Sequence, residues 1–101
     1  MQGLIEDWET LPRKRIIWRT TSASGATRED DADAIPLSCA LAFAVRQRLT
    51  VTAADGYALA LGPSDVQSAY LACLSGTWTL ILPGDGTRRR FVKHPISFAG
   101  K

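Results

Sequence analysis

The segment between residues 64 and 76 constrains the fold of this chain more than any other part of its sequence. Ser64 is followed three residues later by Gln67, which is the spacing of a capping box at a helix N-terminus. Pro63 precedes the box, and Asp65 lies in the first turn, where the helix dipole favours a negative charge. Gly76 can adopt the left-handed conformation that ends a helix. The pattern therefore predicts a helix that begins near Ser64 and ends before Gly76.

Two short turns predict β-hairpins on either side of this helix. Residues 49–52 and 57–61 alternate as strands do around Asp55-Gly56, the preferred chemistry of a tight hairpin turn. Residues 77–82 and 87–93 flank Pro83-Gly84-Asp85-Gly86 in the same way, and Pro95 limits the last strand to a sheet edge or an end. Residues 15–21 are rich in β-branched and aromatic side chains and predict a further strand.

Residues 37–45 allow two interpretations. Five large apolar or cysteine side chains alternate along them as in a strand, whereas Leu37, Leu41 and Val45 also share one face of a helix. The alanines at positions 40, 42 and 44 favour a helix, because alanine is a strong helix former and a poor strand former. We expect a helix from about Cys39 to Arg48, with a strand as the alternative.

The N-terminal segment, residues 1–12, has an apolar stripe at helical spacing: Leu4, Ile5, Trp8 and Leu11. It predicts a short amphipathic helix that ends before Pro12. A helix this short is marginal by itself, so the stripe should dock on its own domain in the first place, or on a neighbouring subunit. Tryptophan is enriched both in cores and at interface hot spots. We expect Trp78 in the core and Trp8 in an intermolecular contact.

Residues 22–33 combine small, hydroxyl and acidic side chains without any large apolar residue, so we expect residues 22–35 to form a mobile loop. Taken together, the segments predict one small α+β domain over residues 1–101. It should contain two β-hairpins and one or two helices packed on an antiparallel sheet, with residues 1–12 as a candidate docking segment.

The charge of the chain is small but unevenly distributed. Its 101 residues are 46% hydrophobic and 22% charged, which is an ordinary globular composition, and the formal net charge of +2 is too small to predict a polyanionic partner. From Arg46 onward there are seven bases and three acids, whereas the first 45 residues carry five bases and seven acids. This asymmetry favours head-to-tail contact between copies of the chain, or contact with an anionic partner on one side, and the alternative is an ordinary surface.

The sequence also bears on location and redox state. Glu6, Asp7 and Glu9 occupy the region where a secretory signal would be apolar, and no stretch approaches the roughly 20 apolar residues of a membrane span. We therefore expect no membrane contact and a cytoplasmic location, or a place in a virion if the chain is of phage origin. Cys39 and Cys73 lack CxxC spacing and lie among small apolar residues, which is typical of buried thiols.

Candidate catalytic and metal-binding groups are few. His94 is the one histidine, and Lys93 and Pro95 beside it match no nucleophile motif, so we expect a surface or edge-strand histidine. The acids at 29–33 lack the spacing of a calcium loop, and residues 83–87 lack the lysine and helix of a phosphate loop. We expect no catalytic residue, no metal and no cofactor.

Arginine side chains gather near two of the predicted strands. On a strand, Arg88 and Arg90 would project to solvent while Phe91 pointed inward. We expect a patch for an anion or an acidic partner, formed by Arg46, Arg48, Arg88, Arg89 and Arg90. The alternative is that these arginines stay hydrated and protect an edge strand from pairing.

Two segments resemble a known family. The hairpin of residues 48–57, with its Asp55-Gly56 turn, and the Ser-capped helix of residues 64–70 resemble the small phage head-tail joining proteins of the gpW type. The resemblance covers less than half of the chain. It implies a role in virion assembly.

These observations predict a non-enzymatic protein that binds other proteins or assembles with itself, as a structural or accessory component of a phage or virion. Its interface would use Leu4, Ile5, Trp8 and Leu11. The alternative is a small basic module that binds nucleic acid through the five arginines, or that mimics nucleic acid as an inhibitor. Binding to phosphates would weaken steeply as salt rises, which distinguishes the two.

Overall fold

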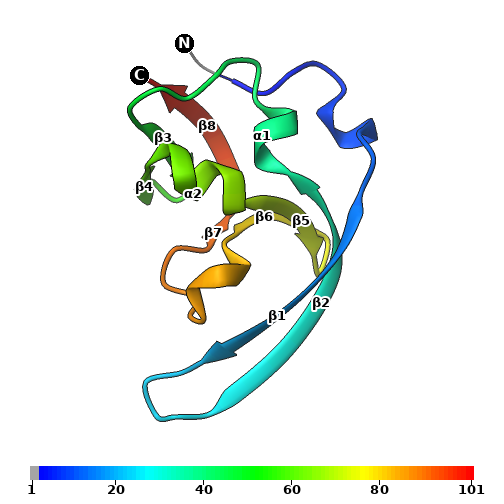
Figure 1. The fold of residues 1–101 in the computed structure, drawn as a ribbon, viewed down its shortest axis with the longest axis vertical. Helices are drawn as coiled ribbons and strands as arrows, with labels where there is room; N and C mark the ends of the chain where they lie inside the picture. Colours follow the sequence, from blue (N-terminus) through cyan, green and yellow to red (C-terminus); the bar gives the residue numbers. More distant parts are fainter. Residues whose placement is uncertain (1–2) are drawn as a thin grey trace.

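In the computed structural model, which describes residues 3–101, eight strands form two antiparallel sheets, joined by two short α-helices and two 3-10 turns (Figure 1). The α+β fold class expected from the sequence is confirmed. The strands are β1 Lys14–Thr21, β2 Thr27–Pro36, β3 Leu49–Ala53, β4 Ala58–Leu61, β5 Tyr70–Leu74, β6 Thr77–Ile81, β7 Val92–Lys93 and β8 Pro95–Gly100. The helical segments are η1 Trp8–Thr10, α1 Leu37–Ala40, α2 Pro63–Ser68 and η2 Pro83–Asp85.

One sheet has five strands in the order β1-β2-β5-β6-β7, and the other has three in the order β4-β3-β8. The hairpin of β1 and β2, which we call the arm, extends away from the rest of the domain, which we call the body (Figure 1). His94 joins the two sheets between β7 and β8, with φ of 51° and an exposed side chain. Its backbone bonds to Trp78 of one sheet and to Ala54 beside the other.

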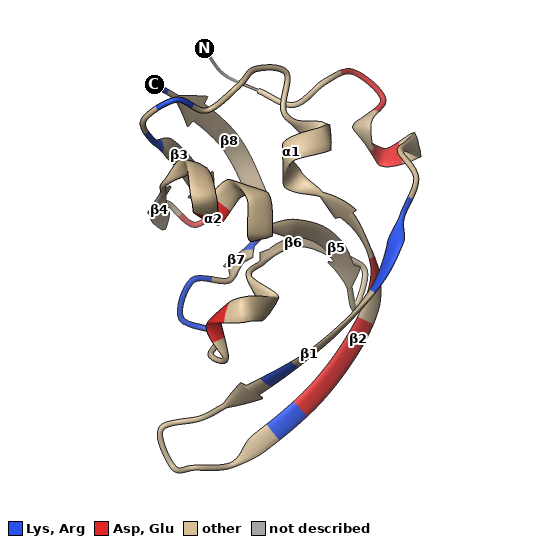
Figure 2. Ribbon diagram, in the orientation of Figure 1, with Lys and Arg blue, Asp and Glu red and all other residues tan. Residues whose placement is uncertain are grey.

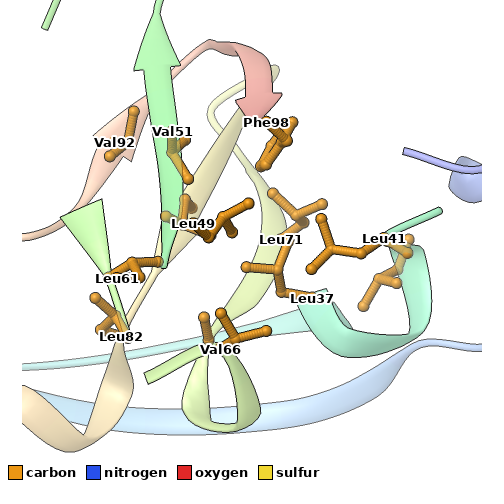
Figure 3. Close-up of a cluster of buried hydrophobic side chains, with 14 of the residues drawn as sticks. Leu37, Leu41, Leu49, Val51, Leu61, Val66, Leu71, Leu82, Val92 and Phe98 are labelled. Carbon is orange, nitrogen blue, oxygen red and sulfur yellow. The ribbon is translucent and has the colours of Figure 1, made fainter. Parts of the chain in front are cut away.

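The main core lies between the two sheets and the helices (Figure 3). Leu71 and Leu80 come from the large sheet, Leu49 and Val51 from the small one, and all four are fully buried. Leu37 of α1 and other side chains close this core. Burial of apolar surface contributes about 25 cal/mol per Å², so these contacts are the main source of stability.

The prediction of a mobile loop at residues 22–35 is wrong for most of this segment. Residues 27–36 form β2, which pairs with β1 from Thr21↔Thr27 to Lys14↔Ala34. The acids of β2 are stabilised in a strand because basic side chains stand opposite them on β1: Arg19 pairs with Glu29. Figure 2 shows these acidic residues along β2. The turn of the arm is confined to residues 22–26.

The helix expected from Ser64 to Gly76 begins and ends elsewhere. Gly62 is the N-cap of α2, and its N–H donates to Oδ2 of Asp65 at 3.1 Å, so Asp65 takes the role that the sequence assigned to Gln67. The helix stops at Ser68, and the following residues form β5 between β2 and β6. Gly76 has φ of 81°, but it lies in the tight β5–β6 turn and ends no helix.

The element expected after β2 also differs from expectation. The helix proposed for residues 39–48 is wrong, and so is its strand alternative, because α1 is a single turn that ends at Ala40. Residues 3–5 run beside this point, where the N–H of Ile5 donates to the Ala40 carbonyl at 2.8 Å, and Leu4 forms a bridge with Leu41. These bonds compete with helix continuation, because they occupy backbone groups that a longer helix would need.

The first predicted hairpin is confirmed, because β3 and β4 pair from Leu49↔Leu61 to Thr52↔Ala58. The second is right in its pairing and wrong in its extent. Strands β6 and β7 pair only at Thr79↔Lys93 and Leu80↔Val92, and a long loop over residues 82–91 joins them. The three arginines at 88–90 therefore lie on this loop and not on a strand.

Candidate functional site

The arm is attached to the body at both of its ends. At its base, β2 pairs with β5 from Ala34↔Ala72 to Pro36↔Tyr70. At its tip, the N–H of Thr21 donates to the carbonyl of Gly86 at 2.8 Å. Gly86 has φ of 72°, a conformation that suits glycine. The arm is therefore held like a strap, with its middle free of strand pairing to the body.

The loop of residues 82–91 holds the arm through side chains as well. The ring of Phe91 packs edge-on against Trp18 of β1, with centroids 6.4 Å apart. Arg88 forms an ion pair with Asp30 of β2, whose other oxygen accepts from Nε of Arg28 at 3.1 Å. These contacts lie on the inner face of the arm.

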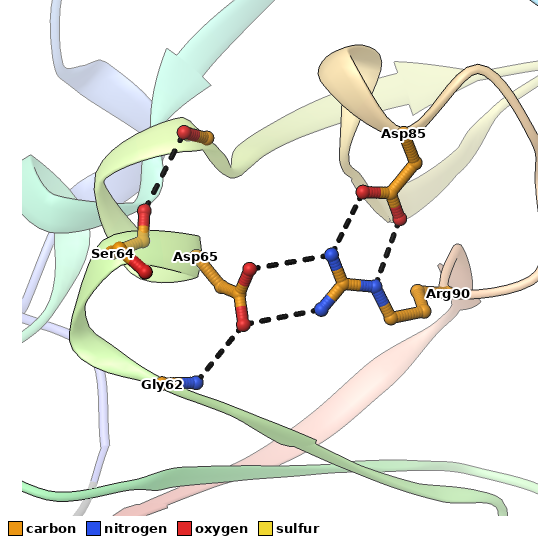
Figure 4. A network of polar contacts seen from close by, with 6 residues as sticks. Gly62, Ser64, Asp65, Asp85 and Arg90 are labelled. Atoms are coloured by element: carbon orange, nitrogen blue, oxygen red, sulfur yellow. Dashed lines mark hydrogen bonds and ion pairs between the residues drawn. The ribbon is translucent and has the colours of Figure 1, made fainter.

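The loop itself is fixed to α2 by one arginine. The guanidinium of Arg90 contacts both oxygens of Asp85, at 2.7 and 2.8 Å, and both oxygens of Asp65, at 3.1 and 3.2 Å (Figure 4). The Arg90 hydrogen bond, followed by that of the Gly62 N–H, lowers the pKa of Asp65. The two carboxylates, Asp85 first, raise the pKa of Arg90. We call this arrangement the Arg90 clamp.

A groove of about 980 Å³ lies between the arm and the body. Its lining includes residues 30–33 of β2 on one side and residues 73–75 of the β5–β6 hairpin on the other. Successive residues of a strand point to opposite faces of the sheet. A hollow that touches all of residues 30–33 therefore runs along the edge of β2 rather than over one face. Trp18, Tyr57 and Phe91 add aromatic surface to the groove.

One edge of strand β2 is unpaired along this groove, while its other edge pairs with β1. Beyond Ala34↔Ala72 the β2–β5 ladder ends, so β2 and β5 part like a fork and residues 27–33 pair only with β1. The Thr21 N–H bonds to Gly86 and therefore points away from β2. In an antiparallel ladder the backbone groups of successive residues point alternately toward and away from the partner strand, so this bond fixes the direction of the N–H and C=O groups along both strands. The N–H and C=O groups of Glu29 and Asp31 therefore point away from β1, toward the open edge, and so does the N–H of Asp33, whose C=O belongs to the end of the β2–β5 ladder.

Trp18 carries a second unused hydrogen-bonding group at the groove. The side chain is 3% exposed, and its indole Nε1 is buried without a partner among the described residues. A buried donor left unpaired costs about 1–3 kcal/mol, and such groups in a folded protein call for an explanation. The groove is thus incomplete in hydrogen bonding, both on its backbone edge and in one of its buried side chains.

The predicted arginine patch is not assembled. The backbone N–H groups of residues 46–48 bond to the carbonyl of Lys101, which places Arg46 and Arg48 beside the C-terminal strand. Residues 88–90 lie in the loop near η2, farther along the long axis of the molecule (Figure 2). Arg88 and Arg90 pair with acidic side chains of the same chain, which compensates their charge.

The N-terminal apolar residues lie largely on the body. Leu4, Trp8 and Leu11 pack against the main core. The ring centroids of Trp8 and Trp78 are 4.7 Å apart. Ile5 is half-buried. The predicted helix over residues 1–12 is absent from residues 3–12, where η1 is the only helical turn, and residues 1–2 lie outside the described part. Trp78 is half-buried at the edge of the core.

The thiols are placed differently from expectation. Cys39 and Cys73 are both exposed and free, so the prediction of buried thiols is wrong. Over residues 3–101 there is no group of three or more His, Cys, Asp or Glu side chains placed to hold a metal ion. None of the helices in this range has the length and apolar character to cross a membrane.

Sequence reasoning missed the groove because it treated β2 as a loop. A signal was present: Ala32 and Ala34 alternate with Asp31 and Asp33, and the acidic run follows a basic strand at hairpin distance. Comparisons with protein-family models, with curated proteins and with solved structures found no match to this chain.

Proposed function

We propose that this chain is a non-enzymatic protein-binding module that acts within an assembly, and that the arm–body groove is its interface. The composition of the groove is the observation that carries the proposal. Seven of its 19 lining residues are arginine or aromatic, the residue types that dominate binding energy at protein interfaces: Arg13, Arg15, Trp18, Arg28, Tyr57, Arg88 and Phe91.

The construction of the groove supports the same function. The pairing of β2 with β5 at the base of the arm and the Thr21–Gly86 bond at its tip hold the arm in place, and the Arg90 clamp fixes the loop that carries Gly86. The groove therefore exists before any partner binds. Preformed surfaces bind more tightly, because less conformational freedom is lost on association. Tyr57 is 45% exposed at the groove and offers a large apolar ring beside a hydroxyl group.

The experiment that tests this function is site-specific photo-crosslinking in extracts of the source cells. A photoreactive phenylalanine analogue replaces Tyr57 in the groove, and in a matched control it replaces Ser68, which is exposed on α2 outside the groove. We expect a discrete protein adduct from position 57 and none from position 68. A second substitution in the groove, Thr77→Arg, should abolish the adduct by filling the hollow.

Two results would overturn the proposal. An adduct pattern that is the same at positions 57 and 68, or that survives Thr77→Arg, would show that the groove is not the interface. Purified chain that carries material absorbing at 260 nm, and releases it as salt rises, would instead favour the nucleic-acid alternative. Light scattering on a sizing column with absorbance at 260 and 280 nm reads out the second result.

A further inference from the structure

The open edge of β2 offers a row of backbone groups that a partner can use. Glu29 and Asp31 each present an N–H and a C=O to the groove, Asp33 presents its N–H, and no described strand other than β1 pairs with Glu29 or Asp31. Deepening the function proposed above, we infer that the partner inserts an extended basic segment into the groove, where it adds to the sheet as a strand beside β2.

Backbone geometry selects an extended chain. Unpaired N–H and C=O groups on a strand edge are satisfied in the plane of the sheet by a chain about 4.7–4.9 Å away. The fork between β2 and β5 leaves that place free, because the two strands separate beyond Ala34↔Ala72. A helix keeps its own backbone groups bonded internally and cannot complete this edge.

The charges on the outer face of β2 favour a basic segment over an acidic one. Strand β2 carries four acids between residues 27 and 33 and one base, Arg28. The strand already paired with β2 shows the complementary pattern, because Arg15 and Arg19 of β1 form ion pairs with Asp31, Asp33 and Glu29. A strand on the other edge lies beside the same three carboxylates and can share them with Arg15 and Arg19, since opposite charges on adjacent strands are stabilising.

The inner face of the added strand meets different chemistry. Ala32 and Asp30 of β2 point to the side where Trp18 lies, with its unpaired Nε1. Small side chains fit beside Ala32, because the inner face of β2 is narrow there. The segment that fits best therefore alternates basic residues, on the outer face, with small residues on the inner face.

A second copy of the chain fits this edge poorly. Two β2 edges paired antiparallel would place acidic side chains opposite each other, which is destabilising. The β1 strand of another copy is basic, but it arrives as one strand of a two-stranded arm, and the groove is bounded on its far side by the β5–β6 turn. The favoured occupant is a single extended segment of a different protein.

The test uses the full chain and three capped five-residue peptides. The probe is Arg-Val-Arg-Val-Arg, which alternates as the edge requires. A second peptide, Arg-Arg-Val-Val-Arg, has the same composition and charge without the alternation. The third is the probe with a methyl group on the backbone nitrogen of each arginine. This change keeps the side chains and removes the backbone N–H groups that face β2. Titration calorimetry measures affinity, and amide hydrogen exchange by NMR maps the site.

We expect the probe to slow exchange of the amides of Glu29, Asp31 and Asp33 at least tenfold, with little change at residues 30 and 32, whose N–H groups already face β1. Both control peptides should bind at least tenfold more weakly. Equal binding by the N-methylated peptide would overturn the proposal, because only side-chain charge would then be recognised.

Substitutions on the two edges of the arm provide a matched pair. Asp31→Pro removes an N–H that faces the groove, whereas Ile17→Pro removes the corresponding N–H on the opposite edge, since these residues are partners in the ladder. Proline is tolerated at edge positions whose N–H faces away from the neighbouring strand. We expect Asp31→Pro to weaken probe binding at least tenfold, Ile17→Pro to leave it within twofold, and Asp31→Asn to fall between them.

The remaining outcomes separate this proposal from the function on which it rests. A probe that fails to bind, together with a specific adduct at position 57, overturns strand addition and leaves the groove as an interface. Failure of both experiments overturns both proposals. Protection of the three amides that rises with protein concentration alone would assign the edge to a second copy and overturn the basic partner.

Discussion

Replacement of Arg90 by methionine tests whether the Arg90 clamp holds the groove in shape. The guanidinium makes four contacts of 2.7–3.2 Å with Asp65 and Asp85, while its side chain stays 34% exposed. Exposed ion pairs contribute about 0–1 kcal/mol, and loss of one partner of a buried pair costs about 3–5 kcal/mol. Because Arg90 is partly exposed, we expect Arg90→Met to lower the free energy of unfolding by an amount between these limits, about 1.5 kcal/mol. For a domain of this size this corresponds to a decrease in Tm of roughly 6–12 °C.

Urea and thermal denaturation followed by circular dichroism measure this loss. Arg89→Met is the matched control, because the neighbouring side chain forms no ion pair among residues 3–101 and should change the free energy of unfolding by less than about 0.5 kcal/mol. Amide exchange adds a local readout. Since the clamp fixes the loop that carries Gly86, Arg90→Met should speed exchange at Thr21 more than at Ile35.

The effect of pH on the clamp has a definite sign. The pKa of Asp65 is lowered from its ordinary value of 3.8, so its contribution is fully present above that value and is lost as pH falls through the lower folded pKa. The pKa of Arg90 is raised, so its contribution persists at all working pH values below 12. A deficit in Arg90→Met below about 0.5 kcal/mol, or one that is as large at pH 2.5 as at pH 7, would refute the reasoning.

Further substitutions test the packing and the backbone geometry that support the site. Leu71→Ala, at a fully buried position, should lower the free energy of unfolding in urea by about 2–5 kcal/mol. Gly76→Ala should cost about 1–2 kcal/mol because φ is 81° there, whereas Gly84→Ala, with open space around its Cβ, should be close to neutral in the same assay. Gly100→Ala would drive its Cβ into the ring of Phe43 and should cost about 1–3 kcal/mol, partly restored by Phe43→Leu.

Local sequence patterns predicted the elements whose partners are close in the chain. The β3–β4 hairpin follows from its turn sequence, and β1 follows from its β-branched and aromatic residues. The pattern failed where distant segments decide the structure. Tyr70–Leu74 has no strong strand signal, yet it becomes β5 because it lies between β2 and β6 and buries Leu71. The capping signal near Ser64 predicted a helix through these residues, and pairing with β2 and β6 overrode it.

The candidate site depended most on such distant contacts. Asp30 was visible only as a member of an acidic run, and its ion pair with Arg88 joins two segments that no local pattern relates. The fork between β2 and β5 is likewise a property of the ladder's length, which hydrophobic alternation does not encode. Of the arginine and aromatic residues that line the groove, only Arg88 was expected in a binding site, and nothing in its local sequence indicated that it meets β2.

The bond between Thr21 and Gly86 also has a consequence for the order of folding. The arm can form from neighbouring residues, but its tip can dock only after the loop of residues 82–91 is in place. Contacts between residues far apart in a chain are slow to form, because a large loop must be closed first. The groove should therefore be completed late in folding and should open early when the native state fluctuates. A partner that binds there would distinguish the finished domain from its folding intermediates.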